Sequence, residues 1–407
     1  MDLTLPARPF ADREGMAALI AALGAGDARL VGGCVRDTLL GLAAADIDVA
    51  TKHEPERTLA LLRAAEIRAV PTGLAHGTVT AVLPFGPVEV TTLRRDVSTD
   101  GRHAVVRFAQ DWRDDAARRD FTINALYADP VTGEVFDWHG GLADLAARRI
   151  RFIGDPLQRI AEDHLRILRF FRFHARFGDA VDDEGLDACT ARANDLMALS
   201  RERIAAELLK LLVARDAVAV VRLMVERRIL AAVLPEIDAA GAGRLTTLAA
   251  REAAAGIAPD AIRRLAALAP ADVAAAVGAR LKLSNVQRKR LEAANGGVGD
   301  EGPLGLAYRV GAAGAVDRLL LAGGDPGALA DWHPPRLPIG GGELVVLGLI
   351  RGPAVAAALR EVERRWIAEG FPGIDRVRTI ASEVVGQAKG GASAISDQAS
   401  SASSGRA

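Results

Sequence analysis

The chain has 407 residues, of which 50% are hydrophobic and 25% charged, and its formal net charge at pH 7 is −1. This length exceeds what one hydrophobic core usually supports, so several modules are expected. The charge balance does not favour attraction of the whole chain to a polyanion, no apolar run reaches the length of a membrane-spanning helix, and two cysteines are too few for a disulfide framework. The N-terminal stretch MDLTLPARPFADREG lacks the pattern of a signal peptide, so a cytoplasmic location is expected.

Residues 28–152 alternate short β-branched runs with short helical patterns. Helices are expected at 35–41 and 55–65, the second because Pro55 suits the first turn of a helix. Runs bounded by Gly, Pro or charged residues predict about five strands, at 28–33, 46–51, 67–71, 77–84 and 87–93.

From Asp155 onward the pattern is almost entirely helical, so the chain is expected to have an α+β fold. The stretch 155–178 predicts one long helix, which an Asp-Pro pair starts and a glycine ends, and Ser200 is a predicted N-cap. Further helices are expected over 215–385. Residues 386–407 hold Gly, Ser and Ala with almost nothing to bury, which predicts a disordered tail.

Arginines gather in the first helical stretch. Between Arg148 and Arg176 there are eight Arg against one Glu and two Asp. On its own this run favours a solvated helix face. Because phenylalanines are interleaved with the arginines, the run also allows a groove for phosphates and bases.

A glycine pair, Gly32 and Gly33, stands between the first predicted strand and the helix after it. There the backbone N–H groups can approach an anion without side-chain interference, and the partial positive charge of the helix start adds to the attraction. Arg36, in the first turns of that helix, can reach the same anion. By itself, such a pair more often marks a plain tight turn.

Two aspartates strengthen the hypothesis of an anion site. Asp46 and Asp48 are two positions apart in a predicted strand, so their side chains share one face, with Ile47 and Val49 on the other. Such carboxylates repel each other unless a cation lies between them, and hard oxygen ligands of this kind suit Mg²⁺ together with a substrate phosphate. A metal–nucleotide site is therefore expected, and the alternative is a solvent-facing edge strand.

These segments together resemble the polymerase-β-like nucleotidyltransferase superfamily, and within it the class II CCA-adding enzymes and bacterial poly(A) polymerases. The first motif is GGCVRDTLLG with the DID that follows, and the others come in family order: TGLAHGTVTAV, RRDFTINAL, DWHGGLADLAARRIRFIGDP, EDHLRILRFFRF and SRERIAAELLKLL. The resemblance implies a mixed-sheet catalytic head at 1–150, a base-recognising helical neck at 151–212, an RNA-binding helical body at 213–325 and a helical tail at 326–385, ahead of the disordered segment 386–407.

The resemblance also implies the reaction, which is template-independent addition of C, C and A from CTP and ATP to the 3′ end of tRNA, with pyrophosphate released in a two-metal mechanism. Mg²⁺ is the implied cofactor, Asp46 and Asp48 are its implied ligands, and the implied partner is RNA rather than DNA or a membrane. Glu89 lies in a strand that can reach these aspartates and help as ligand or base, or it can instead pair with Arg94. The sequence carries no prediction of oligomeric state.

The same resemblance implies how the nucleotide is held. It assigns Gly32, Gly33, Arg36 and Arg119 to the triphosphate, Asp120 and Asn124 to the ribose, and Asp163 and Arg166 to the base. Arg169 and Arg172 match the same motif, but helix periodicity limits what they can share with Asp163, so looser contacts, to phosphate or to neighbouring side chains, are expected for them. For Asp120 and Asn124 the alternative is helix capping and local hydrogen bonding.

Base selection has a physical rationale in this motif. Asp163 and Arg166 are three positions apart in the predicted helix, hence neighbours on one face. Cytosine and adenine both present an exocyclic amine beside a ring-nitrogen acceptor, so a carboxylate next to a guanidinium can select them against uracil and guanine. The alternative is an ordinary salt bridge within the helix. Arg172 is expected on the side of a straight helix opposite Asp163.

Two other functions stay open on the sequence. A bacterial poly(A) polymerase shares these motifs. A non-catalytic RNA-binding protein on a transferase scaffold is a further alternative, which the intact Asp46, Asp48, Arg119 and Asp163 disfavour because carboxylates that only repel each other are costly to keep.

Overall fold

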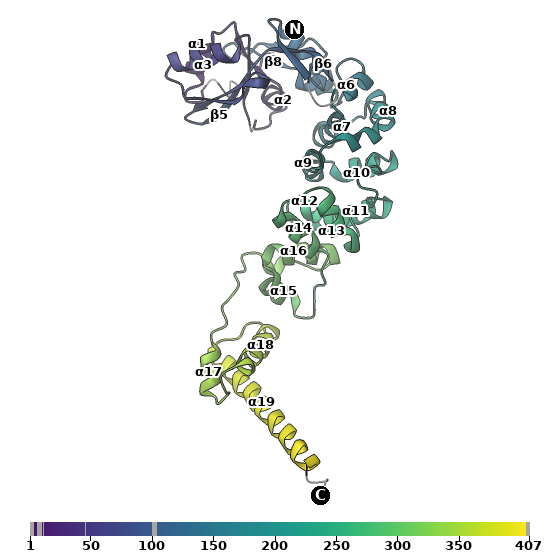
Figure 1. The fold of residues 1–407 in the computed structure, drawn as a ribbon. Coiled ribbons are helices and arrows are strands. Elements are labelled where there is room, and N and C mark those ends of the chain that lie inside the picture. The colour runs from purple at the N-terminus through teal and green to yellow at the C-terminus, as the bar shows by residue number, and fades with distance from the viewer. Residues whose placement is uncertain (1–3, 6–9, 11, 45, 100–103, 404–407) are drawn as a thin grey trace. The chain divides into compact units, whose positions relative to one another are not determined.

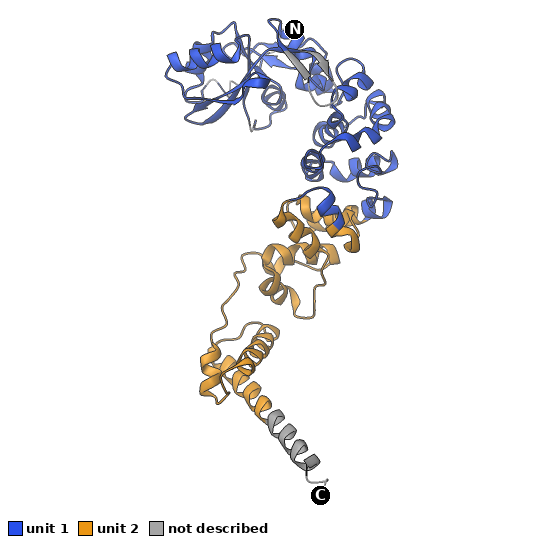
Figure 2. Cartoon of the chain, viewed as in Figure 1, with its two compact units in different colours: residues 1–243, 276–283 blue, residues 244–275, 284–407 orange. Residues whose placement is uncertain are grey.

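The computed structural model describes residues 4–5, 10, 12–44, 46–99 and 104–403, and it describes the side chains of these residues except at 96–99, 104–106 and 390–403. The chain divides into two compact units (Figure 2). The first is formed by residues 1–243 and 276–283, and the second by residues 244–275 and 284–407. An α+β part is followed by helices, as the sequence predicts (Figure 1).

A mixed sheet of seven strands in the first unit carries the first motifs. Its strands lie in the order β3-β4-β5-β2-β1-β8-β9. Their bounds are β1 Ala28–Val31, β2 Asp48–Thr51, β3 Ala69–Gly73, β4 Thr78–Leu83, β5 Gly86–Thr92, β8 Tyr127–Ala128 and β9 Val135–Phe136. β2 and β5 pair in parallel and the other neighbours are antiparallel. β1 to β5 match the five predicted strands.

In the part of the chain that the structure describes, four strands lie outside the sequence prediction. β8 and β9 have two residues each, which is too short for a periodic pattern to show. The other two, β6 Arg94–Thr99 and β7 Ala104–Phe108, form a separate antiparallel hairpin.

Among the described residues, five helices accompany the sheet, and a hydrophobic cluster joins one of them to it. The helices are α1 Met16–Leu23, α2 Gly33–Leu39, α3 Pro55–Ala64, α4 Trp112–Ala117 and α5 Gly141–Ala146. α1 packs against α3, which also contacts β3 and β4. Trp112 of α4 packs with Val31, Ala50 and Tyr127 from three neighbouring strands. This cluster anchors the segment after α4, which carries the RRD motif, to the sheet.

The rest of the chain is helical. Its helices are α6 Pro156–Glu162, α7 Leu165–Phe177, α8 Asp183–Ala191, α9 Arg201–Leu212, α10 Ala217–Glu226, α11 Ala239–Ala254, α12 Ala261–Leu268, α13 Ala274–Arg280, α14 Asn285–Ala294, α15 Gly302–Val310, α16 Ala312–Ala322, α17 Gly341–Val346, α18 Pro353–Ala368 and α19 Ile374–Ser403. Short 3₁₀ turns lie at Leu74–His76, Thr122–Asn124, Ala193–Ala198, Ala271–Val273 and Gly327–Leu329. Within the described part of the chain, no helix combines the length and the apolar character needed to cross a membrane.

The prediction of one long helix over 155–178 is wrong. The chain forms α6 and α7 instead, and Asp163 between them is extended, with φ −153° and ψ 106°. Its carboxylate accepts a hydrogen bond from the N–H of Leu165 at 3.1 Å and so caps the second helix. The predicted ends are confirmed, because the Asp155 carboxylate accepts from the N–H of Leu157 and Gly178 follows the last turn.

The predicted N-cap at Ser200 is confirmed in position, although its side chain makes no capping hydrogen bond. Helix α19 continues to Ser403, whereas the sequence predicts disorder over 386–407. The alanines in this segment, and the lack of proline, are compatible with a helix. Residues 404–407 lie outside the described residues, and the division into head, neck, body and tail stays a prediction.

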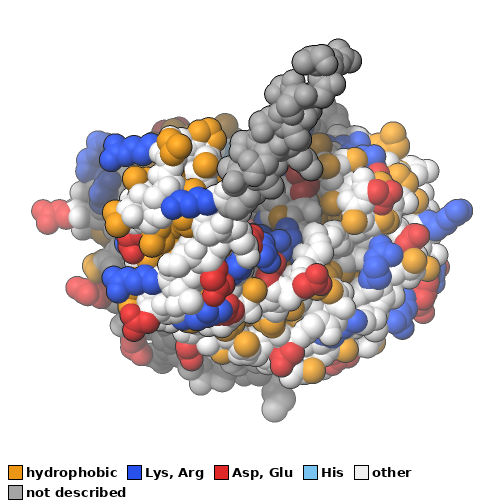
Figure 3. All heavy atoms as spheres, turned by 90° about the horizontal axis from the view of Figure 1, so that it is seen from below, with side chains coloured by type: hydrophobic (Ala, Val, Ile, Leu, Met, Phe, Trp, Pro, Cys, Tyr) orange, Lys and Arg blue, Asp and Glu red, His pale blue; other side chains and the backbone are white. Residues whose placement is uncertain are grey.

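A cluster of buried charges connects helices of the second unit. Asp317, on α16, is fully buried and accepts hydrogen bonds from Arg290 at 2.8 Å and from Arg263 at 3.3 Å. Glu252, on α11, accepts from Arg263 and Arg264, both at 2.8 Å. Since the four helices α11, α12, α14 and α16 each contribute a charge, the cluster fixes them together. On the face of the molecule in Figure 3, basic and acidic side chains are likewise interspersed.

We expect Asp317→Asn to lower the free energy of unfolding of this unit by about 1.5–3 kcal/mol, because Arg263 and Arg290 lose a buried carboxylate that they share, although Glu252 and Asp260 still pair with them. Denaturant unfolding followed by circular dichroism measures the change. The matched control is Asp375→Asn, since that side chain is 97% exposed. Equal unfolding midpoints for the two variants would contradict the role of the buried cluster.

Candidate functional site

The turn between β1 and α2 brings backbone and arginine together. Gly32 has φ +72° and ψ −121°, a conformation that residues with a Cβ rarely adopt. A Cβ added to Gly32 would lie 3.2 Å from Nη1 of Arg119 and 3.5 Å from the carbonyl oxygen of Asn124. Gly33 begins α2. Gly32 therefore permits both the turn and the close approach of the RRD segment, which the sequence alone could not distinguish from a plain tight turn.

Carboxylates gather at the start of β2. Asp48 pairs with Glu89 across the parallel β2–β5 ladder, so the two side chains lie side by side on one face of the sheet. Asp46 is exposed and precedes the strand, which begins at Asp48 rather than at the predicted position 46. Ile47 and Val49 are buried on the other face, as predicted. Burial and the nearby charges of Glu89 and Asp46 raise the pKa of Asp48, against the lowering effect of Arg119.

The chemistry of this carboxylate group fits a divalent cation. Asp46, Asp48 and Glu89 supply only hard oxygen donors, and their mutual repulsion would be relieved by a cation. Among the described residues, no three His, Cys, Asp or Glu side chains are gathered tightly enough to enclose a metal ion by themselves. A cation bound by one or two carboxylates commonly takes its remaining ligands from phosphate oxygens and water.

Arg36 belongs to a buried network that joins α2 to the RRD segment. It donates to Asp37 at 2.8 Å and to the side-chain oxygen of Asn124 at 2.5 Å. Its guanidinium lies 4.2 Å from the centre of the Phe177 ring. Burial lowers the pKa of Arg36. The predicted triphosphate contact Arg36 and the predicted ribose contact Asn124 are thus directly bonded to each other.

Asp120 connects this network to the helices that follow. Its carboxylate accepts hydrogen bonds from the N–H of Phe121 at 2.9 Å, from Asn124 at 3.0 Å and from Nε of Arg169 at 2.7 Å. Burial by itself would raise the pKa of Asp120, but Arg169 and Asn124 lower it to about 2. The alternative for Asp120 and Asn124 is local hydrogen bonding, and those local bonds are present. In addition, Asp120 pairs with Arg169 from α7.

Asp163 and Arg166 do not pair with each other. Asp163 lies outside the helix, and its two carboxylate oxygens accept from Arg203 of α9 at 2.8 and 3.1 Å. Arg166 pairs with Glu162 and donates to the carbonyl oxygen of Arg118 at 3.0 Å. The predicted sharing of one helix face is therefore wrong, because Asp163 is the residue that breaks the helix. The alternative, a salt bridge between the two residues, is not formed, and base reading by Asp163 and Arg166 stays a prediction.

Arg169 and Arg172 both extend from α7 over the same aromatic ring, 5.3 and 4.2 Å from the centre of Phe173. Arg172 pairs with Glu207 of α9 at 2.6 Å. Burial by itself would lower the pKa of Arg169, but the Asp120 carboxylate raises it. Arg169 therefore belongs to the central network, while Arg172 contacts a neighbouring helix, which is one of the looser roles expected for it.

Several residues that contact the predicted site residues are absent from the sequence-based prediction. Asp115 and Tyr127 hold Arg119, and Asp115 could have been recognised from its position four residues before that arginine. Arg203 and Glu207 approach from α9, and Asp37 pairs with Arg36. No spacing signal links α9 to α7, since these contacts depend on how the helices pack.

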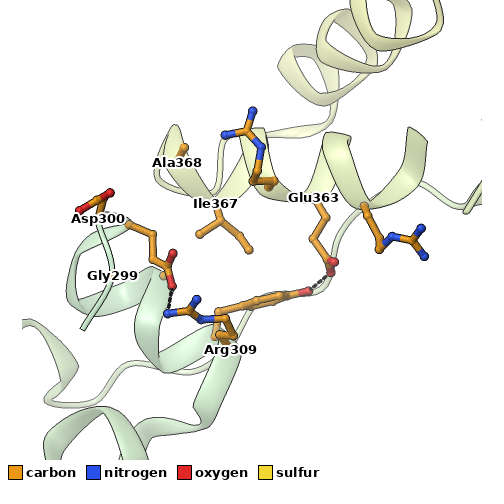
Figure 4. A pocket seen from close by; sticks show the side chains of 11 residues that line it. Gly299, Asp300, Arg309, Glu363, Ile367 and Ala368 are labelled. Atoms are coloured by element: carbon orange, nitrogen blue, oxygen red, sulfur yellow. Dashed lines mark hydrogen bonds and ion pairs between the residues drawn. The ribbon is translucent and has the colours of Figure 1, made fainter. Parts of the chain in front are cut away.

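A cavity of about 820 Å³ lies elsewhere, between α15 and α18 of the second unit (Figure 4). Arg309 on its wall pairs with Glu301, and Glu363 accepts a hydrogen bond from Tyr308. None of the predicted site residues lines it. The site described above is therefore distinct from this cavity.

Comparison with known proteins connects this geometry to a family. A family model described as the poly A polymerase head domain matches residues 28–151, and a second, described as a probable RNA and SrmB-binding site of polymerase A, matches residues 180–240. The mouse mitochondrial CCA tRNA nucleotidyltransferase 1 is 34% identical over 366 residues, which covers 84% of this chain and 83% of that protein. The chain belongs to the CCA tRNA nucleotidyltransferase family.

Other relatives agree with this assignment. A CCA-adding enzyme of Levilactobacillus brevis is 43% identical over 189 residues, which cover 46% of either chain. Among solved structures, the Bacillus stearothermophilus CCA-adding enzyme in complex with CTP aligns with a TM-score of 0.68 and 27% identity, over 92% of this chain and 98% of that one. The Thermotoga maritima CCA-adding enzyme complexed with tRNA shares the fold at 18% identity, with the same TM-score of 0.68. The expected family and α+β fold are confirmed.

The raised pKa of Asp48 predicts a cost to stability. An acid whose pKa is higher in the folded than in the unfolded state destabilises the fold above both pKa values and has no effect below both. We therefore expect Asp48→Asn to raise the melting temperature at pH 8, with a gain that shrinks as the pH falls toward the ordinary aspartate value of 3.8.

Scanning calorimetry from pH 5 to 8, with chelator and without nucleotide, measures this gain. Asp46→Asn is the matched control, and we expect a smaller gain because that carboxylate is exposed. A variant Asp48→Asn that melts below the parent protein at pH 8 contradicts the interpretation.

Proposed function

We propose that this protein adds C, C and A to the 3′ end of tRNA, using CTP and ATP and releasing pyrophosphate. The observation that carries the proposal is the placement of Asp48 beside Glu89. The positive charge of Arg119, which lies at the Gly32 turn, acts on Asp48. A carboxylate group next to a cationic turn is what a reaction between a hydroxyl and a nucleoside triphosphate requires. The family supports the same reaction.

Divalent-metal dependence follows from the family, and we propose Mg²⁺ held by Asp46 and Asp48. When bound there, it would lower the pKa of the RNA 3′-hydroxyl and stabilise charge on the triphosphate. Glu89 would serve as a further ligand or as the base for that hydroxyl. The 3′-oxygen forms its bond to the α-phosphorus as the bond to pyrophosphate breaks.

The cationic groups around the glycine turn would hold the nucleotide. Gly32, Gly33, Arg36 and Arg119 are proposed to bind the triphosphate, through backbone N–H groups and guanidinium N–H donors. Asp120 and Asn124 are proposed to bind the ribose. Arg36 donates a hydrogen bond to Asn124, and Asn124 donates one to Asp120. These side chains are therefore already fixed in position before a nucleotide would bind.

Asp163 and Arg166 are proposed to read the base, with Arg169 and Arg172 in supporting positions. In the structure Asp163 faces Arg203, and Arg166 faces Glu162. Reading a base with this pair would therefore require both side chains to exchange these partners for the amine and the ring nitrogen of C or A.

The proposed partners are the 3′ end of tRNA, CTP and ATP. We propose the cytoplasm as the location, since both cysteines, Cys34 and Cys189, are free and buried.

Incubation with Mg²⁺ and tRNAs ending at the discriminator base, at C or at CC tests the proposal. Each nucleotide is offered singly and in combination. Ordered addition that stops at CCA is expected. A long A-tract would instead indicate a poly(A) polymerase, which is the second candidate because the matched family model is described as a poly A polymerase head domain. No incorporation would indicate a non-catalytic RNA-binding protein.

We expect Asp163→Ala to reduce discrimination against UTP about 10- to 100-fold, since a well-placed pair of hydrogen bonds to a base contributes about 1–3 kcal/mol. The ratio of kcat/KM for CTP to that for UTP is the measurement. Asp187→Ala, which removes a carboxylate that is 73% exposed, is the matched control and should leave the ratio unchanged. Unaltered discrimination in Asp163→Ala would remove Asp163 from base reading.

A further inference from the structure

Three side chains of the first unit form a closed ring of hydrogen bonds beside the glycine turn. The hydroxyl of Tyr127, on β8, donates to Oδ2 of Asp115, on α4, at 2.5 Å. Arg119, in the segment after α4, donates from Nε to the Tyr127 oxygen and from Nη2 to the same Asp115 oxygen, each at 3.1 Å. The three residues thus bond pairwise.

Packing explains the ring of Tyr127 but not its hydroxyl. The side chain is fully buried, with ring centres 6.0 Å from Trp112 and 5.4 Å from Trp138. A phenylalanine would fill this space equally well. The hydroxyl is the part that reaches Arg119 and Asp115, so the polar contact needs an explanation besides the core.

The ring determines which edge of the Arg119 guanidinium is left to face the site. Nε and Nη2 are taken by Tyr127 and Asp115, and Nη1 points toward Gly32, where an added Cβ would lie 3.2 Å away. Arg119 is also the positive charge that acts on Asp48. A long, flexible side chain is therefore held in one orientation between the glycine turn and the carboxylates.

The charges leave this arrangement cationic. Asp115 is 2% exposed, and its Oδ1 accepts from Arg118 at 2.8 Å and from the N–H of Arg94 at 3.2 Å. One buried carboxylate thus serves two guanidinium groups, so a net positive charge remains. The carbonyl oxygen of Arg118 also accepts from Arg166 at 3.0 Å, which secures the same segment from α7.

We propose that Asp115 and Tyr127 are positioning residues, which hold the guanidinium of Arg119 so that its free edge binds the triphosphate of the incoming nucleotide. This inference rests on the proposed function, because it takes the triphosphate as the ligand of Arg119. Without the Tyr127 hydroxyl, Arg119 can turn both of its nitrogens onto Asp115 as a bidentate pair and withdraw from the turn.

Tyr127→Phe tests the proposal, since it keeps the ring and removes only the hydroxyl. We expect the KM for CTP and for ATP to rise about five- to tenfold, the loss expected for one ordinary hydrogen bond. The kcat should change less than about threefold, because binding lost equally from ground and transition states appears in KM. The KM for tRNA and the melting temperature should stay close to those of the parent protein.

The chain contains only one other tyrosine, which provides a matched control. Tyr308 donates its hydroxyl to Glu363 at 2.8 Å, in the second unit. Tyr308→Phe makes the same chemical change to the same kind of bond and should leave both nucleotide KM values unchanged. Asp115→Asn is a second variant that weakens the same ring from the other side, and it should raise the nucleotide KM in the same direction.

A double-mutant cycle with Arg119→Lys separates positioning from a structural effect. If Tyr127 acts through Arg119, Tyr127→Phe adds little to the KM of the Arg119→Lys variant. A full additional increase would overturn the proposal, as would an unchanged KM in Tyr127→Phe while Arg119→Lys is impaired. An unchanged nucleotide KM in Arg119→Lys would instead remove Arg119 from triphosphate binding, and with it that part of the proposed function.

Discussion

Parallel pairing of β2 with β5 places the carboxylates of Asp48 and Glu89 side by side, and the sheet of the first unit keeps this pairing although the two like charges repel each other. The register is held from the opposite face, where Val49 pairs with Val90 and both side chains are buried. A slip of one residue would turn these valines to solvent, so the hydrophobic effect maintains a like-charge contact that electrostatics opposes. The positive charge of Arg119 offsets part of this cost. A bound cation would relieve the repulsion that remains.

Ion pairs hold the arginines around the site, because each of them has an acidic partner within the first unit. The pairs are Arg36–Asp37, Arg119–Asp115, Arg166–Glu162, Arg169–Asp120 and Arg172–Glu207. Buried guanidinium groups without counter-charges would be strongly destabilising. Pairing also restricts the rotamers of these side chains, so less entropy is lost when a nucleotide binds. The same contacts link segments distant in the sequence, since Asp120 follows α4 whereas Arg169 lies on α7.

Sequence reasoning succeeded where a local pattern carries the information. β1 to β5 lie where alternating or β-branched runs predict them, and the ends of the 155–178 segment follow from an Asp-Pro pair and a glycine. The prediction of a single helix failed at Asp163, because the helical spacing of apolar residues continues through this position and gives no sign of a break. The side chain of Asp163 bonds the backbone of Leu165, and Arg203 holds the carboxylate in place. A residue that competes with the helix for backbone hydrogen bonds is not visible in periodicity.

The sequence by itself determined the strands β1 to β5, the position of the glycine turn and the family, since spacing, turn chemistry and motif order are local properties of the chain. Only the tertiary structure decided which charges meet. Glu89 reaches Asp48 through strand pairing, Arg169 reaches Asp120 through helix packing, and Tyr127 reaches Arg119 because β8 lies beside β1. The physical reason is that hydrogen bonds and ion pairs act over a few ångströms, and the partners become neighbours only after the hydrophobic core has brought distant segments together.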